Sequence, residues 1–344
     1  MNRDEQYMLR ALELATLGRG QVSPNPMVGC VIVHEDKIIG EGYHQKYGAA
    51  HAEPNAFNNV QDRDVLKQST AYVTLEPCAH YGKTAPCATL LVEKQIKKVV
   101  IAVQDPNPLV AGKGIEILQK AGIAVEVGVL QKEAQSLNKR FFTQFNLTRP
   151  FVILKWAQTL DGFVAKADYN SKWISNSHSR QMVHRWRTEE DAIMVGTKTA
   201  YYDDPKLNVR EWQGKNPVRI VIDSQLTLDN NLSLFDHSQP TLCYNLIKEE
   251  EEENLTFVKL DKEFTIRDIL QDLNHRRIQS LIVEGGSFLL QKFISEEQWD
   301  EARVFIAGKK FGGGIPAPLL SQKAGEIIDV MGDQLYVYKN DFIN

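Results

Sequence analysis

Residues 71–87 read AYVTLEPCAHYGKTAPC and combine a strand signal, a polar loop and the start of a helix. The first five residues, Ala71 to Leu75, are apolar or β-branched, which is typical of a strand. Cys78 and Cys87 lie at the two ends of the polar loop, with eight residues between them. The stretch fits a catalytic metal site that carries an insertion, a structural metal site, or no site at all.

The rest of the first half alternates between strand and helix signals around this stretch. We expect further strands at 29–33, 38–43, 99–103 and 125–129, and helices at 7–17, 51–60, 88–95, 114–121 and 133–145. Such alternation predicts an α/β fold in which helices cover both faces of a sheet.

A second α/β series follows the segment NLTRP at 146–150, whose proline and polar residues are typical of a linker. Its strands are expected at 151–157, 192–196, 218–223, 241–244, 280–283, 302–306 and 334–339, and its helices at 177–190 and 266–276. The acidic run Glu249–Glu253 is expected to be a solvated loop. Because 344 residues are many for one core, we predict two domains, 1–146 and 147–344.

Charge and cysteine content restrict the possible partners and the compartment. The net charge is −4 and there is no basic run, so neither nucleic acid nor an anionic membrane is expected as a partner. No apolar run approaches the roughly 18 residues of a membrane span. The N-terminal stretch MNRDEQYMLRALELA lacks the apolar core of a signal peptide. Four cysteines are too few for a disulfide scaffold, so we expect a cytoplasmic protein.

A candidate metal site joins the cysteine loop to the sequence HAE, which contains His51 and Glu53. Both can project from a helix N-terminus, where partial positive charge favours thiolates, the form that binds zinc. Three protein ligands with an open fourth position are typical of catalytic zinc, whereas structural zinc has four. His80 is the nearest further histidine, but its spacing is not convincing for a ligand. A catalytic site formed by His51, Cys78 and Cys87 is therefore favoured.

In a catalytic site, zinc lowers the pKa of a bound water toward ~7. Glu53 would take the proton of this water and pass it to a departing amine. Structural zinc, or two small buried cysteines without a metal, remain alternatives. Cys30 in GCVIV and Cys243 in PTLCYN are expected to lie in the core.

Five motifs of the first half resemble the N-terminal domain of the bifunctional riboflavin-biosynthesis deaminase–reductases, which belong to the cytidine-deaminase-like superfamily. They are SPNPMVG at 23–29, GYH at 42–44, HAE at 51–53, EPC…TAPC at 76–87 and QDPNPLVAGKG at 104–114. The resemblance implies that His51, Cys78 and Cys87 are zinc ligands and that Glu53 is the proton shuttle. It also implies that the long cysteine gap is a loop that holds a phosphorylated ribosylaminopyrimidine.

Four residues are candidates for binding this substrate: Asn25, His44, His80 and Lys83. Donor or cationic side chains in the loop can bind its phosphate or ring oxygen, and an amide at Asn25, between two prolines, can read the pyrimidine edge. The chain departs from the family pattern at Ala79, Ala85 and Pro54. A proline in a first helical turn is well tolerated, so Pro54 need not displace Glu53.

The second half has no GxGxxG, so a Rossmann nucleotide domain is not indicated. Its motifs instead resemble the C-terminal reductase of the same family, which has a dihydrofolate-reductase-like fold and uses NADPH. They are KWAQTLDG at 155–162, SKWIS at 171–175, RTEEDAIMVGTKTAYYDDPKLNVR at 187–210, VIDS at 221–224 and VEGGSFLL at 283–290. The glycines of VEGG stand at an expected helix N-terminus that suits a phosphate.

The resemblance assigns roles in the second half. The candidate cofactor-binding residues are Ala157, Trp173, Thr199, Asp203, Ser224, Gly286 and Ser287. The candidate substrate-binding residues are Ser171, Arg187, Leu207, Arg210 and Glu284. Lys155 and Glu284 are the candidates for supplying the proton that must accompany hydride transfer to C1′ of the ribose. Thr199 and Asp203 are expected in a loop after the strand AIMVG.

The sequence therefore predicts an enzyme that deaminates a 2,5-diamino-6-(5-phosphoribosylamino)pyrimidin-4(3H)-one with zinc and then reduces its ribosyl group to ribityl with NADPH. The family resemblance also implies a homo-oligomer. One rival is a nucleic-acid base deaminase, which would need a basic groove with stacking aromatic residues. The other is a binding module in which zinc is structural.

Overall fold

The computed structural model describes residues 1–79, 86–170 and 174–340. The chain divides into two compact units, Met1–Leu147 and Thr148–Asn344, which we name the N-unit and the C-unit. The division lies one residue beyond the expected boundary after residue 146. No helix among the described residues combines the length and the apolar character that a membrane span requires.

The N-unit contains a five-stranded sheet in the order β2-β1-β3-β4-β5. Its strands are β1 (Gly29–His34), β2 (Lys37–Tyr43), β3 (Thr70–Val73), β4 (Lys98–Ile101) and β5 (Ala124–Val127). β1 pairs antiparallel with β2 and β3, whereas β3, β4 and β5 are parallel. The carboxyl ends of β3 and β4 therefore lie at the same edge, where ligands bind in sheets of this kind.

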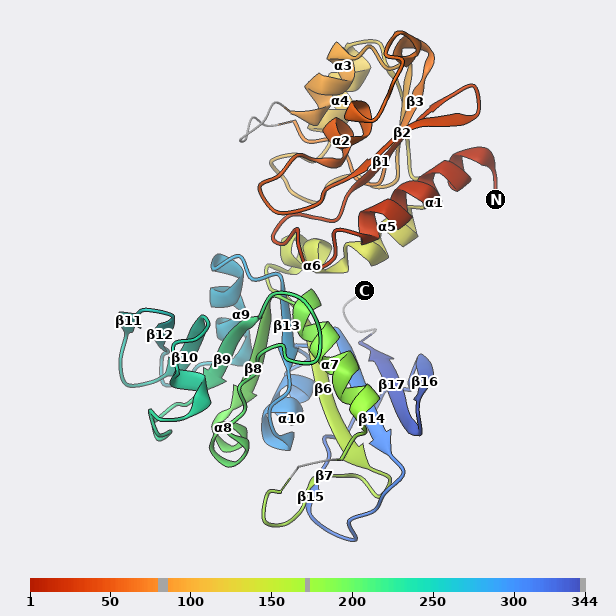
Figure 1. Cartoon of the computed structure of the whole chain (residues 1–344). Coiled ribbons are helices and arrows are strands. Elements are labelled where there is room, and N and C mark those ends of the chain that lie inside the picture. Colours follow the sequence, from red (N-terminus) through yellow and green to blue (C-terminus); the bar gives the residue numbers. More distant parts are fainter. Residues whose placement is uncertain (80–85, 171–173, 341–344) are drawn as a thin grey trace. The chain divides into compact units, whose positions relative to one another are not determined.

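Helices cover both faces of this sheet, as the sequence predicts (Figure 1). They are α1 (Arg3–Thr16), α2 (Ala52–Asn58), α3 (Cys87–Glu93), α4 (Lys113–Lys120), α5 (Gln131–Leu137) and α6 (Lys139–Leu147), with a 3₁₀ turn, η1, at Asp64–Gln68. Because successive strand residues face opposite sides, Ile32 packs in the core beneath α2, α3 and α4. Its neighbour Val31 packs beneath α1, α5 and α6.

The single helix expected at 133–145 is wrong, because Asn138 divides it into α5 and α6. The buried Asn138 side chain accepts a hydrogen bond from the Met27 N–H at 2.8 Å and donates one to the Met27 carbonyl at 2.8 Å. This pairing fixes the main chain next to the SPNP loop. The break in the helix therefore lies at a residue whose side chain is held by a partner far away in the sequence.

The C-unit is built on a ten-stranded sheet in the order β11-β12-β10-β9-β8-β13-β6-β14-β17-β16. Its strands are β6 (Phe151–Thr159), β8 (Ala192–Gly196), β9 (Val218–Ile222), β10 (Thr241–Asn245), β11 (Glu250–Glu252), β12 (Leu255–Lys259), β13 (Ser280–Val283), β14 (Glu301–Ala307), β16 (Glu326–Val330) and β17 (Asp333–Lys339). A small separate ladder pairs β7 (Phe163–Ala165) with β15 (Ile315–Pro316).

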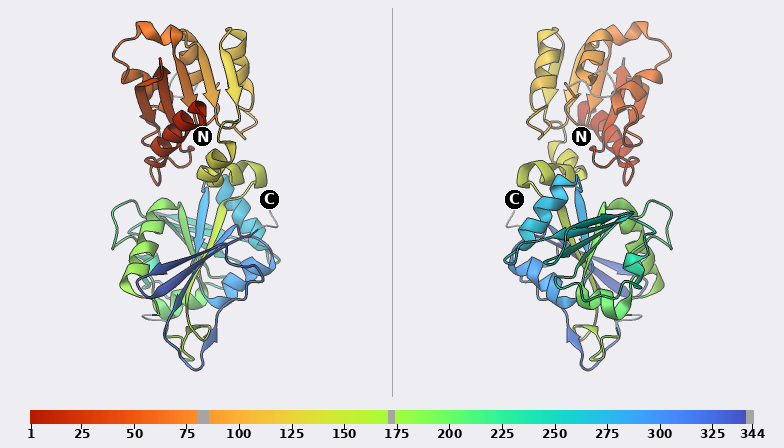
Figure 2. Two further views of the ribbon diagram at one scale, coloured as in Figure 1. Left: turned by 90° about the vertical axis from the view of Figure 1, so that its right-hand side faces the viewer. Right: turned by 90° about the vertical axis from the view of Figure 1, so that its left-hand side faces the viewer.

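Among the described residues of the C-unit, the α-helices that flank the large sheet are α7 (Ser177–Glu189), α8 (Thr197–Asp203), α9 (Ile266–His275) and α10 (Ser287–Ser295). A 3₁₀ turn, η2, lies at Ser233–Phe235. Ile153 of β6 packs in the core with α7 and α8, whereas Val152 and Leu154 pack with α9 and α10 on the other face. Figure 2 shows the green and the blue helices on opposite faces of the sheet. The α/β class predicted for the second half is therefore confirmed.

Two local predictions in the C-unit are wrong. The acidic run is not a loop throughout, because Glu250–Glu252 form the exposed edge strand β11, paired antiparallel with β12. Thr199 and Asp203 do not lie in a loop, because the chain after β8 forms the short helix α8. The strands from β12 through β10, β9, β8, β13 and β6 to β14 are parallel. Their carboxyl ends therefore meet at one edge of the sheet.

A buried ion pair anchors the start of the C-unit. Arg149 donates to both carboxylate oxygens of Asp300 at 2.6 and 2.8 Å, and the two side chains are 7% and 9% exposed. Asp300 also accepts a hydrogen bond from the Val152 N–H, so the pair holds the beginning of β6 next to the beginning of β14.

We expect Arg149→Ala to lower the free energy of unfolding of the C-unit by about 3–5 kcal/mol, because Asp300 is left buried and unpaired. Intrinsic fluorescence during urea unfolding of the whole chain measures this, since all five tryptophans lie in the C-unit. Arg185→Ala is the control, because its ion pair with Glu189 is exposed at the arginine and is worth less than about 1 kcal/mol. Equal effects of the two variants would contradict the prediction.

Candidate active sites

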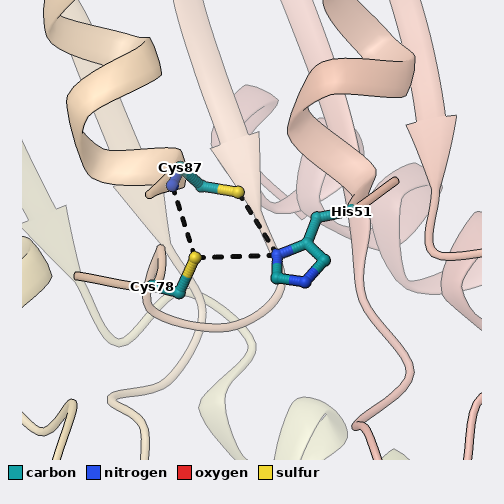
Figure 3. A group of neighbouring side chains, drawn as sticks. All are labelled: His51, Cys78 and Cys87. Carbon is teal, nitrogen blue, oxygen red and sulfur yellow. Dashed lines mark hydrogen bonds between the residues drawn. The ribbon is translucent and has the colours of Figure 1, made fainter. Parts of the chain in front are cut away.

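The N-unit brings His51, Cys78 and Cys87 together at the carboxyl edge of its sheet (Figure 3). His51 is the N-cap residue of α2, Cys87 is the first residue of α3, and Cys78 follows β3. The His51 Nδ1 atom lies 3.6 Å from Cys78 Sγ and 3.4 Å from Cys87 Sγ. The three residues that the sequence predicts as metal ligands thus share one small cluster.

These distances fit a tetrahedral zinc ion. Zinc–sulfur bonds of about 2.3 Å and zinc–nitrogen bonds of about 2.0–2.1 Å at tetrahedral angles place sulfur and nitrogen roughly 3.5 Å apart. Among the described residues, this is the one group of three or more His, Cys, Asp and Glu side chains close enough to hold a metal. One imidazole and two thiolates leave a fourth position of a tetrahedral ion for water or substrate.

The cluster also favours ionised sulfur. The Cys87 N–H donates to Cys78 Sγ at 3.3 Å from the N-terminus of α3. Hydrogen bonds from the Cys87 side chain and from His51 lower the pKa of Cys78, against the opposing effect of burial. The hydrogen bond to Cys78 and burial raise the pKa of Cys87, so the ionised sulfur of the pair is that of Cys78. Cys30 and Cys243, in contrast, are fully buried, and burial raises the pKa of both thiols. This agrees with the core positions expected for them.

Glu53 lies in the first turn of α2, two residues after His51, and is 3% exposed. Burial raises the pKa of its carboxyl, and the charge of Cys78 adds to this. The carboxyl can therefore gain and release a proton more readily near neutral pH than an exposed glutamate can. Pro54 does not interrupt α2, which continues to Asn58.

Asn25 and His44, two of the candidate substrate-binding residues, meet beside this cluster. The His44 Nδ1 atom lies 3.0 Å from the Ala50 carbonyl oxygen, which only accepts, so Nδ1 carries the proton. Its Nε2 atom then accepts a hydrogen bond from Asn25 Nδ2 at 3.1 Å. Burial lowers the pKa of His44, and its ring meets the His51 ring edge-on at 5.3 Å. His80, Lys83 and Ala85 lie outside the described residues, whereas Ala79 is half-buried.

A second polar cluster lies at the carboxyl edge of the C-unit sheet. Arg187 of α7 donates to both Glu284 oxygens, at 3.2 and 2.9 Å, and Glu284 directly follows β13. Lys155 of the neighbouring strand β6 lies 3.7 Å from Glu284, and its side chain is 16% exposed. The Arg187 guanidinium also donates to the Asn208 carbonyl at 3.0 Å, which ties the cluster to the segment before Arg210.

The charges in this cluster determine its protonation. Burial opposes ionisation of Glu284, but the Arg187 guanidinium and the Lys155 ammonium outweigh it and lower the pKa of Glu284 to about 2. Burial lowers the pKa of Lys155, and the Glu284 carboxylate partly offsets this. Glu284 is thus an anion at neutral pH, whereas Lys155 gives up its proton more easily than an exposed lysine does.

The candidate cofactor residues occupy neighbouring strand ends. Gly286 donates its N–H to Thr199 Oγ1 at 2.7 Å and is the N-cap residue of α10, whose first residue is Ser287. A Cβ atom on Gly285 would lie 2.5 Å from the Gly196 nitrogen, so only glycine allows the two turns to approach this closely. The approach places Thr199 beside the N-terminus of α10, the kind of position that favours an anion.

The remaining candidate residues of the C-unit differ in their exposure to solvent. Ala157 and Ser224 are half-buried near the ends of β6 and β9, and Asp203 is exposed at the end of α8. Leu207 is 2% exposed and belongs to the core, so its side chain does not face a ligand. Arg210 is exposed and donates to Asn208 Oδ1. Ser171 and Trp173 lie outside the described residues.

Sequence reasoning missed His184 of α7, which is 5% exposed. Burial lowers the pKa of His184 to about 4, and the charges of Arg187 and Arg210 contribute. Its Nδ1 atom accepts the Arg210 N–H at 3.3 Å, so the neutral ring orients the main chain of a candidate substrate residue. The signal in the sequence was its position one helical turn before Arg187, on the same face of the helix.

Comparisons with known proteins identify the families that the two units resemble. The family model described as the cytidine and deoxycytidylate deaminase zinc-binding region matches residues 1–103, and the RibD C-terminal domain matches 150–331. The riboflavin biosynthesis protein RibD of Aquifex aeolicus is 43% identical over 318 residues, 91% of this chain and 89% of that protein. The RibD of Escherichia coli K12 is 37% identical over 338 residues, 90% of this chain and 89% of the relative.

Solved structures are similar over the whole chain. Acinetobacter baumannii RibD has a TM-score of 0.90 at 35% identity, with 98% of each chain covered. A Thermotoga maritima diaminohydroxyphosphoribosylaminopyrimidine deaminase/5-amino-6-(5-phosphoribosylamino)uracil reductase has a TM-score of 0.89 at 36% identity, also with 98% of each chain covered.

We expect the purified chain to contain one zinc ion, held by the His51–Cys78–Cys87 cluster. Cys78→Ala should reduce the zinc content at least tenfold, because two ligands hold zinc far more weakly than three. Mass spectrometry of metals in the purified protein measures this. Cys243→Ala is the control, since Cys243 is also a free cysteine but lies in the core of the C-unit. Full zinc content in Cys78→Ala would exclude this ligand set.

Proposed function

Because the chain belongs to the RibD family, we propose that its two clusters perform the two reactions of that family on one substrate framework. The chain is a bifunctional enzyme of riboflavin biosynthesis, with a zinc-dependent deaminase domain and a reductase domain that uses NADPH. The N-unit would deaminate the diaminohydroxyphosphoribosylaminopyrimidine. The C-unit would then reduce 5-amino-6-(5-phosphoribosylamino)uracil. The single observation that carries this proposal is the His51–Cys78–Cys87 cluster beside the buried Glu53.

In the N-unit, His51, Cys78 and Cys87 would hold the zinc ion. Zinc supplies the Lewis acidity that makes water nucleophilic near neutral pH. Glu53, whose pKa is raised by burial, would accept a proton and donate it to the amine that leaves C2 of the pyrimidine. Asn25, oriented by His44, would hydrogen-bond the pyrimidine edge. His80 and Lys83 are proposed to contact the ribose or the phosphate.

In the C-unit, Arg187 and Arg210 would bind the sugar phosphate together with Ser171, Leu207 and Glu284. Because the Leu207 side chain is buried, any contact from this residue would come from its main chain. NADPH supplies the hydride that goes to C1′ of the ribose. Lys155 would donate the proton that the ring oxygen or imine nitrogen needs when the sugar opens. Glu284 would keep Lys155 oriented and protonated.

The cofactor would lie along the strand ends that carry the second set of candidates. Gly286 and Ser287 at the N-terminus of α10, together with Thr199 of α8, suit an anionic phosphate. Ser224 would hold the adenosine end and Ala157 would contact nicotinamide through its main chain, with Asp203 and Trp173 completing the site. Asp223, in contrast, uses its carboxylate within its own turn, where it accepts hydrogen bonds from Thr227 and Leu228.

The proposal also covers the ligand, the oligomeric state and the cellular compartment of the chain. The net charge of −4 supports a small anionic substrate rather than nucleic acid as the ligand, because no excess of basic residues is available. All four cysteines are free thiols, which suits the reducing cytoplasm. We further propose a homo-oligomer, which the family resemblance implies.

We expect the chain to release ammonia from the diaminopyrimidine phosphate without NADPH, and to add two hydrogens to the product only with NADPH. Glu53→Gln should keep zinc and lower ammonia release by at least about 10²-fold, the usual effect of a general acid–base. Mass analysis of the products and metal analysis of the protein measure this. Ammonia release at the unaltered rate by Glu53→Gln would exclude the mechanism. Loss of zinc would indicate a structural effect instead.

The C-unit should show a pH dependence that follows from Lys155. Its protonated form is lost as pH rises through its lowered pKa, so NADPH oxidation should fall on the alkaline side. The Glu284 carboxylate favours the protonated form of Lys155. Glu284→Gln should therefore lower the pKa of Lys155 further and move this alkaline limb of the rate profile to lower pH. Initial rates of NADPH oxidation between pH 6 and about 10 test this.

Glu263→Gln, a change of an exposed acid in the same unit, should leave the pH profile unaltered. If the alkaline limb of the pH profile stays in place in Glu284→Gln, or moves to higher pH, Lys155 is excluded as the proton donor. This outcome would not affect the assignment of the deaminase site.

A further inference from the structure

The buried Glu76, the residue before Pro77 and Cys78, collects four main-chain N–H groups. It is 3% exposed. Its Oε1 atom accepts hydrogen bonds from Gly114 at 2.9 Å and Ile115 at 3.3 Å. Its Oε2 atom accepts from Gly112 at 3.0 Å and Asp105 at 3.3 Å. All four donors belong to the segment that links β4 to α4 or to the first turn of α4.

This carboxylate caps α4 from a different part of the chain. The N-cap residue of α4 is Gly112, which has no side chain to accept the first N–H groups of the helix. Glu76 satisfies these N–H groups instead, and its negative charge is favoured at the positive end of the helix dipole. Hydrogen bonds to a charged acceptor are worth about twice as much as neutral ones.

The main chain around Glu76 is equally constrained. The Glu76 N–H donates to the Val103 carbonyl at 3.0 Å, at the end of β4. On the other side, a Cβ atom added to Gly114 would lie 2.1 Å from the Pro77 carbonyl oxygen, so α4 touches the main chain there. The residue before Cys78 is therefore held by β4, by α4 and, through the Glu76 side chain, by residues 105–115.

We propose that Glu76 is a positioning residue of the metal site, which holds the Cys78 main chain in place for metal binding before the ion arrives. The proposal rests on the ligand set proposed above. It adds that the affinity for zinc depends on a side chain that does not itself touch the metal. Cys78 needs such support because the loop that follows it is long, whereas His51 and Cys87 are anchored by the helices they begin.

Only a carboxylate satisfies the geometry of four converging donors. Glutamine has nearly the same size, but its NH₂ group would point at two N–H groups and would leave them without an acceptor. Glu76→Gln therefore keeps the packing and removes two of the four hydrogen bonds. Glu116→Gln is the matched control, because Glu116 lies in the first turn of the same helix but is 60% exposed and pairs with Lys120.

We expect Glu76→Gln to bind zinc at least tenfold more weakly than the unaltered chain. Titration of the metal-free protein with zinc against a chromogenic chelator measures this, at a temperature where circular dichroism shows both proteins folded. Amide hydrogen exchange at residues 105, 112, 114 and 115 should accelerate in the variant. Glu116→Gln should match the unaltered chain in both measurements.

Unaltered zinc affinity and unaltered exchange in Glu76→Gln would overturn the proposal. So would faster exchange without any loss of zinc affinity, because Glu76 would then stabilise α4 alone. If the variant does not fold, the unaltered protein still gives a test. The four amides should stay protected after zinc is removed, and rapid exchange in the metal-free protein would show that the metal positions the loop. If Cys78→Ala retains zinc, in contrast, the ligand set fails rather than the role of Glu76.

Discussion

Both sites depend on one constraint, which is that parallel strands end at the same edge of a sheet. In the N-unit, β3 and β4 place Cys78 and the segment after Val103 side by side. In the C-unit, β6 and β13 place Lys155 beside Glu284, and β8 places Gly196 next to Gly285. The side chains at these ends come from distant parts of the sequence, and the main-chain ladder fixes their separation before any ligand binds.

The two units stabilise buried charge in different ways. The N-unit uses the N-termini of helices, where the main-chain N–H groups of Cys87 and of residues 112–115 face sulfur or carboxylate. The C-unit uses side chains, with Arg187 and Lys155 on either side of Glu284. Main-chain donors are fixed by the fold and suit a site that must hold a metal. The Lys155 ammonium can exchange a proton, and both side-chain cations can move toward an anionic substrate, which suits a site where the charge changes during reaction.

The sequence predicted features that depend on local pattern and missed those that depend on distant partners. Apolar runs identified the central strands, and the HAE and EPC motifs located the metal cluster. The division at Asn138 was not predicted, and the partner of the Asn138 side chain, Met27, lies in another part of the chain. β11 was missed because an edge strand exposed on both faces has no hydrophobic alternation. The hydrogen bonds of Glu76 were not predictable either, because their four donors lie at residues 105–115, far from Glu76 in the sequence.

The long gap between Cys78 and Cys87 does not disturb the metal cluster, because the two ends of the loop are closed independently of its length. The Cys87 N–H donates to Cys78 Sγ, and the Ala88 N–H donates to the Cys78 carbonyl at 3.2 Å. Each doubling of a loop costs only about 0.6 kcal/mol of closure entropy. Two hydrogen bonds and the anchoring of residues 76–78 can offset such a cost. A fold that closes the loop at its base can therefore lengthen it to reach a larger substrate without changing the position of either sulfur.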